Sequence, residues 1–182
     1  MSFKDNLTYN NTTFLDDNIC VIDNFLPEAI WQELYDACIN ATEEDWAEYE
    51  IGPKWINKVL KYPIPSELLL VVAGIIEQAA GEEYTYDGLN LLRRIPPGHN
   101  IAEHWDAQNW VQVAHGVILY LNDDFEGGEI YYPNKGISYK PRRNSLVLHP
   151  ATEPYKHGVN EVTSGMRYYM TMFANHKGTL RD

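Results

Sequence analysis

Residues 111–132 read VQVAHGVILYLNDDFEGGEIYY, and this stretch decides the fold class. Side chains over residues 111–121 alternate as those of a β-strand do, and β-branched and aliphatic residues are frequent among them. The triplet Asn122-Asp123-Asp124 and the pair Gly127-Gly128 then indicate turns, after which residues 129–132 return to a strand pattern. The stretch therefore predicts two short strands separated by turns.

The rest of the second half repeats this pattern. Further β-type runs cover residues 89–95, 101–105, 137–140, 145–149, 156–159 and 166–173, and turn signals between them include Pro96-Pro97-Gly98, Pro133-Asn134, Arg143-Asn144 and Ser164-Gly165. Helices followed by many short, evenly spaced strands are typical of a jelly roll. We therefore expect a mainly β protein with flanking α-helices, in which a jelly roll is backed by N-terminal helices.

The N-terminal part favours helices. Residues 19–22 (ICVI) predict a short strand, Pro27 suits the first turn of a helix, and a second helix is expected from a cap at Ser66 to a stop at Gly81. The apolar residues at helical spacing are Ile30, Leu34, Ala37 and Cys38 in the first helix and Leu68, Leu69, Val72, Ile75, Ile76 and Ala79 in the second. Segment 43–62 has mixed signals and is either a packed connection, which we favour, or a lid over a site.

A chain of 182 residues suffices for one ordinary domain with a sizeable core. We expect a single domain over residues 1–182. Its helical support is expected over about residues 1–88 and its jelly-roll core over about residues 89–176.

The chain is acidic, with a formal net charge of −12 and a pI near 4.8. Such a surface disfavours nucleic-acid binding, while solubility or, as a weaker explanation, attraction of a basic peptide substrate accounts for the charge. Cys20 and Cys38 form no disulfide framework. We find no signal-peptide pattern, and the longest apolar run, Leu68–Ile76, is too short to span a bilayer. We therefore expect a soluble cytoplasmic protein that does not bind membranes.

His104-Trp105-Asp106 ends one predicted strand. Residues two apart on a strand face the same side, so the imidazole of His104 and the carboxylate of Asp106 can reach one metal ion. A third ligand from a distant strand would complete a facial triad of two histidines and one carboxylate, which is typical of non-haem iron(II) oxygenases. Because an H-x-D pattern also arises by chance, its weight depends on the residues downstream.

His157 and Arg167 provide that support, since Arg167 lies ten positions after His157. If a tight turn around Ser164-Gly165 joins two strands, Arg167 returns beside His157 on the neighbouring strand. The planar guanidinium matches a carboxylate bidentately, so a dicarboxylate could chelate iron at one end and pair with Arg167 at the other. A surface salt bridge is the alternative interpretation of Arg167.

The two faces of the predicted strand 111–121 differ. Its odd positions, Val111, Val113, His115, Val117 and Leu119, suit packing against helices, and its even positions are Gln112, Ala114, Gly116, Ile118 and Tyr120. Small side chains at Ala114 and Gly116 would leave a cavity inside the barrel or would only relieve crowding there. Tyr120 could hydrogen-bond a carboxylate in such a cavity.

Over about residues 89–175 these motifs resemble the 2-oxoglutarate/iron(II) dioxygenases of the prolyl 4-hydroxylase-like group. The matching elements, in order, are His104-x-Asp106, Ile118-Leu-Tyr120-Leu-Asn122-Asp-Asp-Phe-Glu-Gly127-Gly128-Glu, Ser145-Leu-Val-Leu-His149-Pro150, and His157-Gly-Val with Arg167-Tyr168. The helical first half carries almost none of this likeness.

The resemblance implies a double-stranded β-helix, which is a jelly roll, with Fe(II) bound by His104, Asp106 and His157. It also implies a 2-oxoglutarate site in which Arg167 binds the distal carboxylate, together with Tyr120, Thr171 and Ile118. The family reaction oxidises 2-oxoglutarate to succinate and CO2 and places the second oxygen atom of O2 in a substrate C–H bond. Ascorbate is a further candidate cofactor. The presence of Asp106 favours hydroxylation over halogenation, and the expected substrate is a prolyl residue of a peptide or protein, with a free amino acid or another small molecule as the alternative.

Two features depart from the family pattern. Many relatives carry a Tyr nine or ten residues before the first metal-binding His, where this chain has Ile95 and Arg94, and an aromatic residue, often Trp, is common where Phe173 stands. Arg94 is expected at the surface, with a second cationic contact to the cosubstrate as the alternative.

The other histidines are weaker candidates for metal binding. His99 lies in a Pro-Gly turn, His176 is near the C-terminus, and His115 is expected to pack on the helical side. His149 is a candidate for orienting a metal ligand. Two other functions stay open: a jelly-roll binding module that keeps a metal for structure, and a cupin-type hydrolase or isomerase that works without 2-oxoglutarate.

Overall fold

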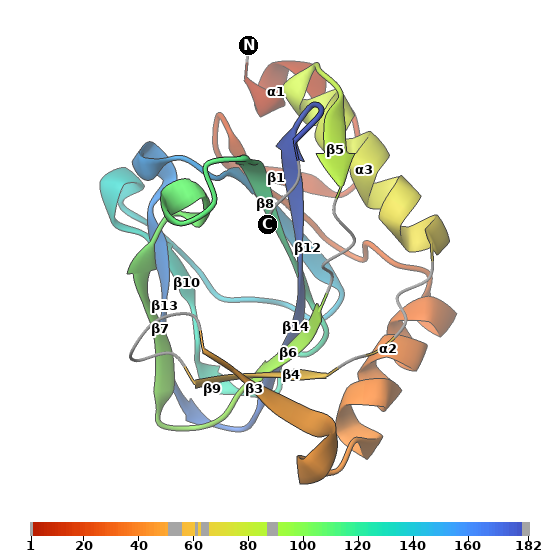
Figure 1. Cartoon of the computed structure of the whole chain (residues 1–182), viewed down its shortest axis with the longest axis vertical. Helices are drawn as coiled ribbons and strands as arrows, with labels where there is room; N and C mark the ends of the chain where they lie inside the picture. Colours follow the sequence, from red (N-terminus) through yellow and green to blue (C-terminus); the bar gives the residue numbers. More distant parts are fainter. Residues whose placement is uncertain (1, 51–55, 61, 63–65, 87–90, 180–182) are drawn as a thin grey trace.

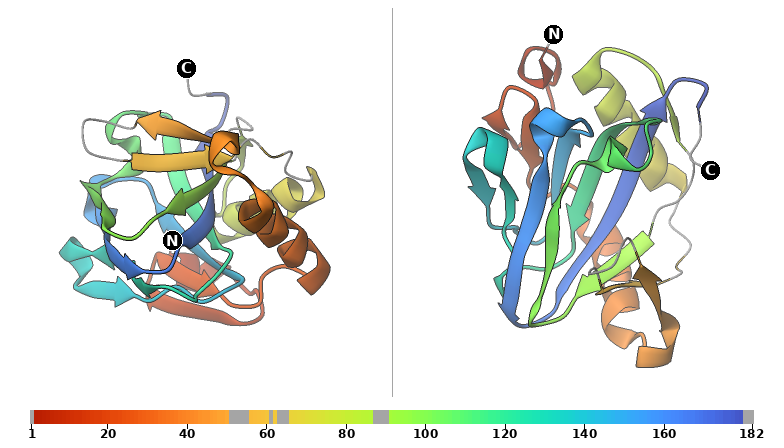
Figure 2. Two further views of the ribbon diagram at one scale, coloured as in Figure 1. Left: turned by 90° about the horizontal axis from the view of Figure 1, so that it is seen from below. Right: turned by 60° about the vertical axis from the view of Figure 1, so that its left-hand side comes forward.

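Two β-sheets face each other and enclose the interior of a barrel, with helices outside one of them (Figure 1). This is a computed structural model, and it describes residues 2–50, 56–60, 62, 66–86 and 91–179. The ring formed by the two sheets is visible when the molecule is viewed from below (Figure 2, left). The expected mainly β jelly roll with flanking helices is confirmed.

The larger sheet has the order β1-β2-β12-β8-β14-β6-β4-β3, and β5 pairs with β14 beside this path. Its strands are β1 (Thr12–Asp16), β2 (Ile19–Ile22), β3 (Trp46–Glu50), β4 (Ile56–Leu60), β5 (Tyr84–Tyr86), β6 (Leu91–Ile95), β8 (Val113–Tyr120), β12 (Ser145–Pro150) and β14 (Arg167–His176). Strand β8 is buried along its whole length, because one of its faces packs into the barrel and the other against the helices.

The smaller sheet has the order β11-β10-β13-β7, and β9 pairs with β13. Its strands are β7 (His99–His104), β9 (Glu126–Gly127), β10 (Ile130–Tyr132), β11 (Ile137–Tyr139) and β13 (His157–Ser164). Apolar residues of the two sheets meet inside the barrel, where Ile118 and Val147 of the larger sheet belong to one buried cluster with Ile130 and Val162 of the smaller. This packing holds the two sheets together inside the barrel, and Ile118 is also one of the residues that line the pocket described below.

The helices cover the outer face of the larger sheet (Figures 1 and 2). They are α1 (Phe3–Asn6), α2 (Glu28–Asn40) and α3 (Ser66–Ala80). Leu34 of α2 and Val72 of α3 are buried in one cluster with Val117 and Leu119 of β8, as the odd positions of that strand predicted. Gly81 ends α3 with a φ of 76°, a conformation that favours glycine. None of the described helices is long and apolar enough to cross a membrane.

The prediction for residues 111–121 was wrong at its first positions. Val111 precedes β8 and is 78% exposed, and Ala114 packs in the helix-side cluster and not in the barrel. The alternation of faces breaks here because the β8–β14 register shifts between Ala174 and Asn175.

The region before residue 88 is less helical than expected, because β1, β2, β3, β4 and β5 all join the larger sheet. Over its described part, segment 43–62 is packed, as favoured, but it consists largely of strands: the 3-10 helix Glu43–Asp45 leads into β3, and β4 pairs with β6. Its described residues are not among those that line the pocket. Residues 51–55 and 61 lie outside the described residues. The β3–β4 pair supplies hydrogen-bond partners for the backbone of β6, which would otherwise be unpaired on that side.

Candidate active site

His104 and His157 are brought together by strand pairing. His104 ends β7 and His157 begins β13, and the antiparallel register places the two residues directly opposite each other. Directly opposed residues have closely spaced Cβ atoms, and here the ring centroids lie 4.5 Å apart. The distant strand that the sequence required for a third ligand is therefore β13.

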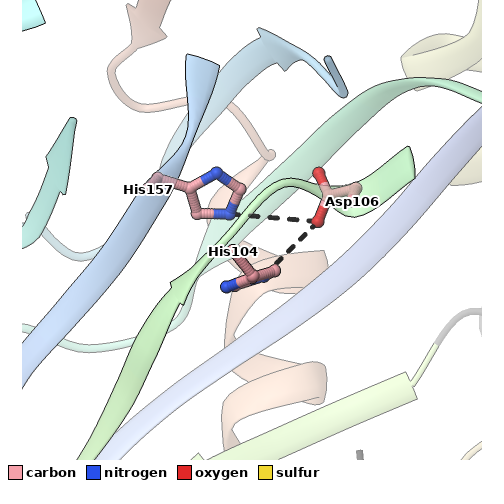
Figure 3. A group of neighbouring side chains, drawn as sticks. All are labelled: His104, Asp106 and His157. Atoms are coloured by element: carbon pink, nitrogen blue, oxygen red, sulfur yellow. Dashed lines mark ion pairs between the residues drawn. The ribbon is translucent and has the colours of Figure 1, made fainter. Parts of the chain in front are cut away.

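Asp106 follows β7 after one extended residue, Trp105, and begins the 3-10 helix Asp106–Gln108. Its Oδ1 atom lies 3.6 Å from Nε2 of His104 and 3.9 Å from Nε2 of His157 (Figure 3). The three candidate ligand atoms lie within 4.8 Å of one another. Ligands about 2.0–2.2 Å from one ion and at right angles are about 3 Å apart, so each pair of ligand atoms needs to close by at most about 2 Å around a metal ion.

Hydrogen bonds to the backbone orient both imidazoles for metal binding. Nδ1 of His104 lies 3.0 Å from the carbonyl oxygen of Ala102, and Nδ1 of His157 lies 3.1 Å from that of Tyr155. Because a carbonyl oxygen only accepts, these contacts place the proton on Nδ1 and turn the Nε2 lone pair of each ring toward Asp106.

The protonation states also suit a divalent cation. Burial lowers the pKa of His157 to about 3, so its ring is neutral near pH 7. Burial by itself raises the pKa of Asp106, but the positive charge that the rings of His157, His104 and His149 carry when protonated in acid outweighs it and holds the pKa well below its usual range. Neutral imidazoles beside an ionised carboxylate are the forms that bind metal.

A cavity of about 430 Å³ opens beside this group. Residues of both sheets line it, and His104, Asp106, His157 and Arg167 are among them. The site therefore contains both a set of metal ligands and a cation for an organic anion.

Arg167 begins β14 and is fully buried, at 0% exposure. Its guanidinium carbon lies 4.9 Å from the ring centroid of Tyr120 and 4.5 Å from that of Tyr169. None of its three side-chain nitrogens has a hydrogen-bond partner among the described residues. A buried charge without a partner is unfavourable, so this site fits a bound carboxylate, and the surface salt bridge considered for Arg167 is wrong.

The expected route of Arg167 into the site was also wrong. β13 and β14 belong to different sheets, so the turn at Ser164-Gly165 does not form a hairpin between them. The chain crosses from the smaller sheet to the larger one, where Arg167 pairs with Ile95 of β6. Arg167 consequently lines the pocket from the opposite sheet to His157 and not from a neighbouring strand.

The other predicted cosubstrate residues lie either at the pocket or, in the case of Tyr120, against Arg167 without being among the pocket residues. Ile118 and Thr171 line the pocket, and Oγ1 of Thr171 accepts a hydrogen bond of 2.8 Å from Nε of Arg93. Tyr120 is fully buried, and its hydroxyl has no hydrogen-bond partner among the described residues. Burial raises the pKa of Tyr120 to about 12, so the hydroxyl stays protonated and can donate.

Arg93, which the sequence analysis did not single out, lines the pocket, whereas Arg94 does not. Arg94 is only 6% exposed, so its expected surface position was wrong. Its guanidinium stacks 4.6 Å from the centroid of Trp46 and pairs with Glu43 at 2.5 Å. Adjacent residues of β6 point to opposite faces, and this alternation was the signal that could have separated Arg93 from Arg94.

Of the remaining histidines, one lies at the pocket and the others lie away from it. His149 is 1% exposed, lines the pocket and places Nε2 at 4.0 Å from Oδ2 of Asp106. His115 packs on the helical side, where Nε2 lies 2.8 Å from the hydroxyl of Tyr84, as expected. His99 and His176 are not among the pocket residues.

The model of the 2OG-Fe(II) oxygenase superfamily matches residues 90–175. A prolyl hydroxylase from Trichoplax adhaerens, solved with a hypoxia-inducible factor oxygen degradation domain peptide fragment, has 19% identity and a TM-score of 0.74, over 88% of this chain and 84% of that one. A prolyl-4-hydroxylase from Pseudomonas putida has 17% identity and a TM-score of 0.73, over 88% and 94%. The collagen prolyl hydroxylase of Paramecium bursaria Chlorella virus-1, solved with 2-oxoglutarate, has 14% identity and a TM-score of 0.66, over 87% and 96%. No curated protein sequence matches the chain.

Proposed function

Residues 90–175 belong to the 2OG-Fe(II) oxygenase superfamily, and from this premise we propose that the chain is a 2-oxoglutarate- and O2-dependent hydroxylase of prolyl residues in a peptide or protein. The observation that carries the proposal is the placement of Arg167. Its fully buried guanidinium, without a hydrogen-bond partner among the described residues, lines the same cavity as His104, Asp106 and His157.

In this proposal His104 and His157 hold Fe(II) through Nε2, and Asp106 holds it through Oδ1. The backbone contacts of the two Nδ1 atoms keep the rings in the tautomer that this requires. Two histidines and one carboxylate would hold the ion with only part of its coordination capacity used, as is typical of non-haem iron(II) oxygenases. The chemistry that Fe(II) supplies when bound is the activation of O2: 2-oxoglutarate becomes succinate and CO2, and one oxygen atom enters a substrate C–H bond.

Arg167 binds the distal carboxylate of 2-oxoglutarate in a bidentate manner, and the hydroxyl of Tyr120 donates to the same carboxylate. The rings of Tyr120 and Tyr169 flank the guanidinium and exclude water from it. In this low-dielectric setting the ion pair is stronger than at the surface, and the dicarboxylate neutralises a charge that is otherwise buried without an anion.

The apolar part of the pocket supports a prolyl substrate. Ile101, Trp105, Trp110 and Val159 line the cavity together with the proposed metal ligands. A pyrrolidine ring is compact and apolar, so it can pack on these side chains with a C–H bond toward the metal site. The T. adhaerens protein was solved with a peptide, which favours a peptide substrate for this chain as well. The net charge of −12 suits a basic peptide.

Neither alternative function accounts for Arg167. A jelly-roll module with a structural metal explains the two histidines and Asp106, and so does a cupin-type hydrolase or isomerase. A buried arginine that lines the cavity is unnecessary in both, since no dicarboxylate has to be held. The same reasoning favours an oxygenase site built for a cosubstrate.

The cosubstrate site is tested by anaerobic spectroscopy. Fe(II) and then 2-oxoglutarate are added to the metal-free protein, and visible absorption is recorded for the wild type, His157→Ala, Arg167→Ala and the control His115→Ala. We expect a charge-transfer band that requires both components, persists in His115→Ala and is absent from the other two variants. Bound iron without a band in the wild type would contradict the proposal.

The substrate is tested by turnover. Succinate formation and the mass of the product are measured with proline-containing peptides of basic and acidic sequence, with the same peptides carrying Pro→Ala, and with free amino acids. The gain of one oxygen atom in the proline peptides alone is expected. Turnover confined to free amino acids would retain the hydroxylase and exclude the prolyl peptide as its substrate.

A further inference from the structure

His149 faces the side of Asp106 that is turned away from the proposed metal position. Oδ1 of Asp106 is directed to Nε2 of His104 and of His157, whereas Oδ2 is directed to Nε2 of His149 at 4.0 Å. Both Oδ2 and this Nε2 are buried and lack a hydrogen-bond partner among the described residues. An N–H group at Nε2 of His149 would therefore be a donor for Oδ2 of Asp106.

The surrounding strands leave space for His149 and Asp106 to approach each other. His149 lies on β12 directly opposite Gly116 of β8, and Phe173 of β14 lies opposite Gly116 on its other side. A Cβ atom at Gly116 would overlap Oδ2 of Asp106 and lie 3.0 Å from Nε2 of His149. The missing side chain thus leaves room for the imidazole and the carboxylate to meet above the sheet.

Aromatic contacts fix the plane of the His149 ring. The ring of His157 lies 4.5 Å away at 73°, and that of Tyr132 lies 5.6 Å away at 71°. Both are edge-to-face arrangements, which restrict rotation of the imidazole. Its Nε2 edge consequently stays directed at Asp106.

The position of the proton on His149 follows from its two contacts. Nδ1 lies 3.3 Å from the carbonyl oxygen of Pro150, which is at the long end of the range for a hydrogen bond. If the proton were on Nδ1, the lone pair of Nε2 would face the lone pairs of Oδ2, and two buried acceptors would lack a donor. A proton on Nε2 satisfies both atoms and gives up only the long contact between Nδ1 and the carbonyl oxygen of Pro150. The carboxylate can rotate about its soft terminal torsion to close the remaining distance of about 1 Å.

We infer that His149 is a positioning residue that donates a hydrogen bond from Nε2 to Oδ2 of Asp106 and so holds this carboxylate to the metal through Oδ1 alone. The inference rests on the metal site of the proposed function. With Oδ2 tied to His149, Asp106 occupies one coordination position and not two. A carboxylate held in this way would not use its second oxygen as a metal ligand.

The test uses Co(II) as a probe of the full chain, titrated anaerobically without 2-oxoglutarate and followed by visible absorption and calorimetry. His149→Phe keeps a ring and removes the donor, His149→Gln restores an N–H near the position of Nε2, and His115→Phe is the matched control for loss of a buried histidine outside the pocket. We expect about 10–100-fold weaker Co(II) binding in His149→Phe, substantial recovery in His149→Gln, and wild-type binding in His115→Phe. Unfolding in urea is measured for each metal-free variant, so that a folding defect is separated from a metal defect.

Three results would overturn the inference. Wild-type affinity in His149→Phe would show that Asp106 needs no donor, and equal weakness in His149→Gln and His149→Phe would assign the effect to packing. At saturating metal, a Co(II) spectrum of His149→Phe with one nitrogen ligand fewer would make His149 a ligand. A wild-type chain that binds no Co(II) would instead refute the proposed metal site, and this inference with it.

Discussion

A methyl group at Gly116 would overlap Oδ2 of Asp106, because the carboxylate occupies the space directly above this glycine of β8. Gly116→Ala is therefore expected to displace Asp106 from His104 and His157. Since the carboxylate can swing into the adjoining cavity, metal affinity should suffer more than folding. We expect Co(II) binding to weaken about tenfold or more, and the free energy of unfolding to fall by about 1–3 kcal/mol. Anaerobic Co(II) titration and urea unfolding measure the two effects, and unchanged Co(II) affinity would contradict the placement of Asp106.

Gly74 of α3 gives the matched glycine substitution away from the pocket. A Cβ at Gly74 would meet nothing within 4 Å, and the residue is exposed inside a helix. Alanine restricts the unfolded chain and favours the helix, so Gly74→Ala should stabilise the protein by about 0.5–1 kcal/mol. Thermal unfolding of the metal-free protein measures this change, and Co(II) affinity should stay at the wild-type value. A lower melting temperature would show that this turn of α3 makes a contact that an added methyl group disturbs.

The strands of the barrel and their turns could be predicted from alternation and from Gly, Pro and Asn signals, because these are local properties of the chain. Pairing partners could not. The turn at Ser164-Gly165 has the sequence of a hairpin, yet it joins β13 of one sheet to β14 of the other. Which sheet each of these strands joins depends on where its apolar side chains become buried, and that depends on residues far away in the sequence.

For the candidate site too, local motifs could be predicted from the sequence, whereas features set by strand pairing could not. The grouping of His104, Asp106 and His157 was predicted from their motifs, and the strand pairing of β7 with β13 supplies the contact. Arg93 was missed because the register of β6 with β14 decides which side chains of β6 face the pocket. β3 and β4 were also missed, although Gly52-Pro53 lies between them in the sequence. Their place at the edge of the sheet depends on the pairing of β4 with β6, which is not a local property of the chain.

The low pKa of His115 predicts how the free energy of unfolding changes with pH. Burial lowers the pKa of His115 from its ordinary 6.5 to about 4, so between these pH values the unfolded chain binds a proton that the folded chain does not. Stability is therefore fully present above pH 6.5 and falls as the pH drops toward 4. In His115→Phe the slope over this window should be smaller by up to about 1.4 kcal/mol per pH unit, which is the contribution of one proton.

Urea unfolding of the metal-free wild type and of His115→Phe, at several pH values in that window, measures the difference between the two slopes. His157 and His149 are present in both proteins. Because the charge of His149 contributes to the low pKa of His115, the measured difference includes the interaction between these two histidines. Tyr84 loses its contact with His115 but keeps its hydrogen bond of 2.7 Å to Glu82. Parallel stability curves would mean that His115 titrates alike in the folded and unfolded chains.

Tyr120 and Tyr139 form a matched pair for the cosubstrate site. Both rings lie in the inner cluster, with centroids 6.4 Å apart, but only the hydroxyl of Tyr139 has a partner, Oγ of Ser145 at 3.2 Å. The hydroxyl of Tyr120 is buried beside Arg167 without one among the described residues. A buried hydroxyl that has no hydrogen-bond partner in the ligand-free protein contributes little to the free energy of folding. It contributes to binding when a ligand brings an acceptor to it.

Tyr120→Phe should accordingly weaken 2-oxoglutarate binding about 10–100-fold, as expected for loss of one hydrogen bond to a charged group, and leave the unfolding free energy of the metal-free protein unchanged or slightly higher. Tyr139→Phe should do the reverse, costing about 0.5–1.5 kcal/mol of stability with no effect on 2-oxoglutarate. Titration of the charge-transfer band with 2-oxoglutarate, paired with urea unfolding, separates the two outcomes. If both variants bind 2-oxoglutarate like the wild type, Tyr120 does not reach the cosubstrate, and Arg167 holds the carboxylate without it.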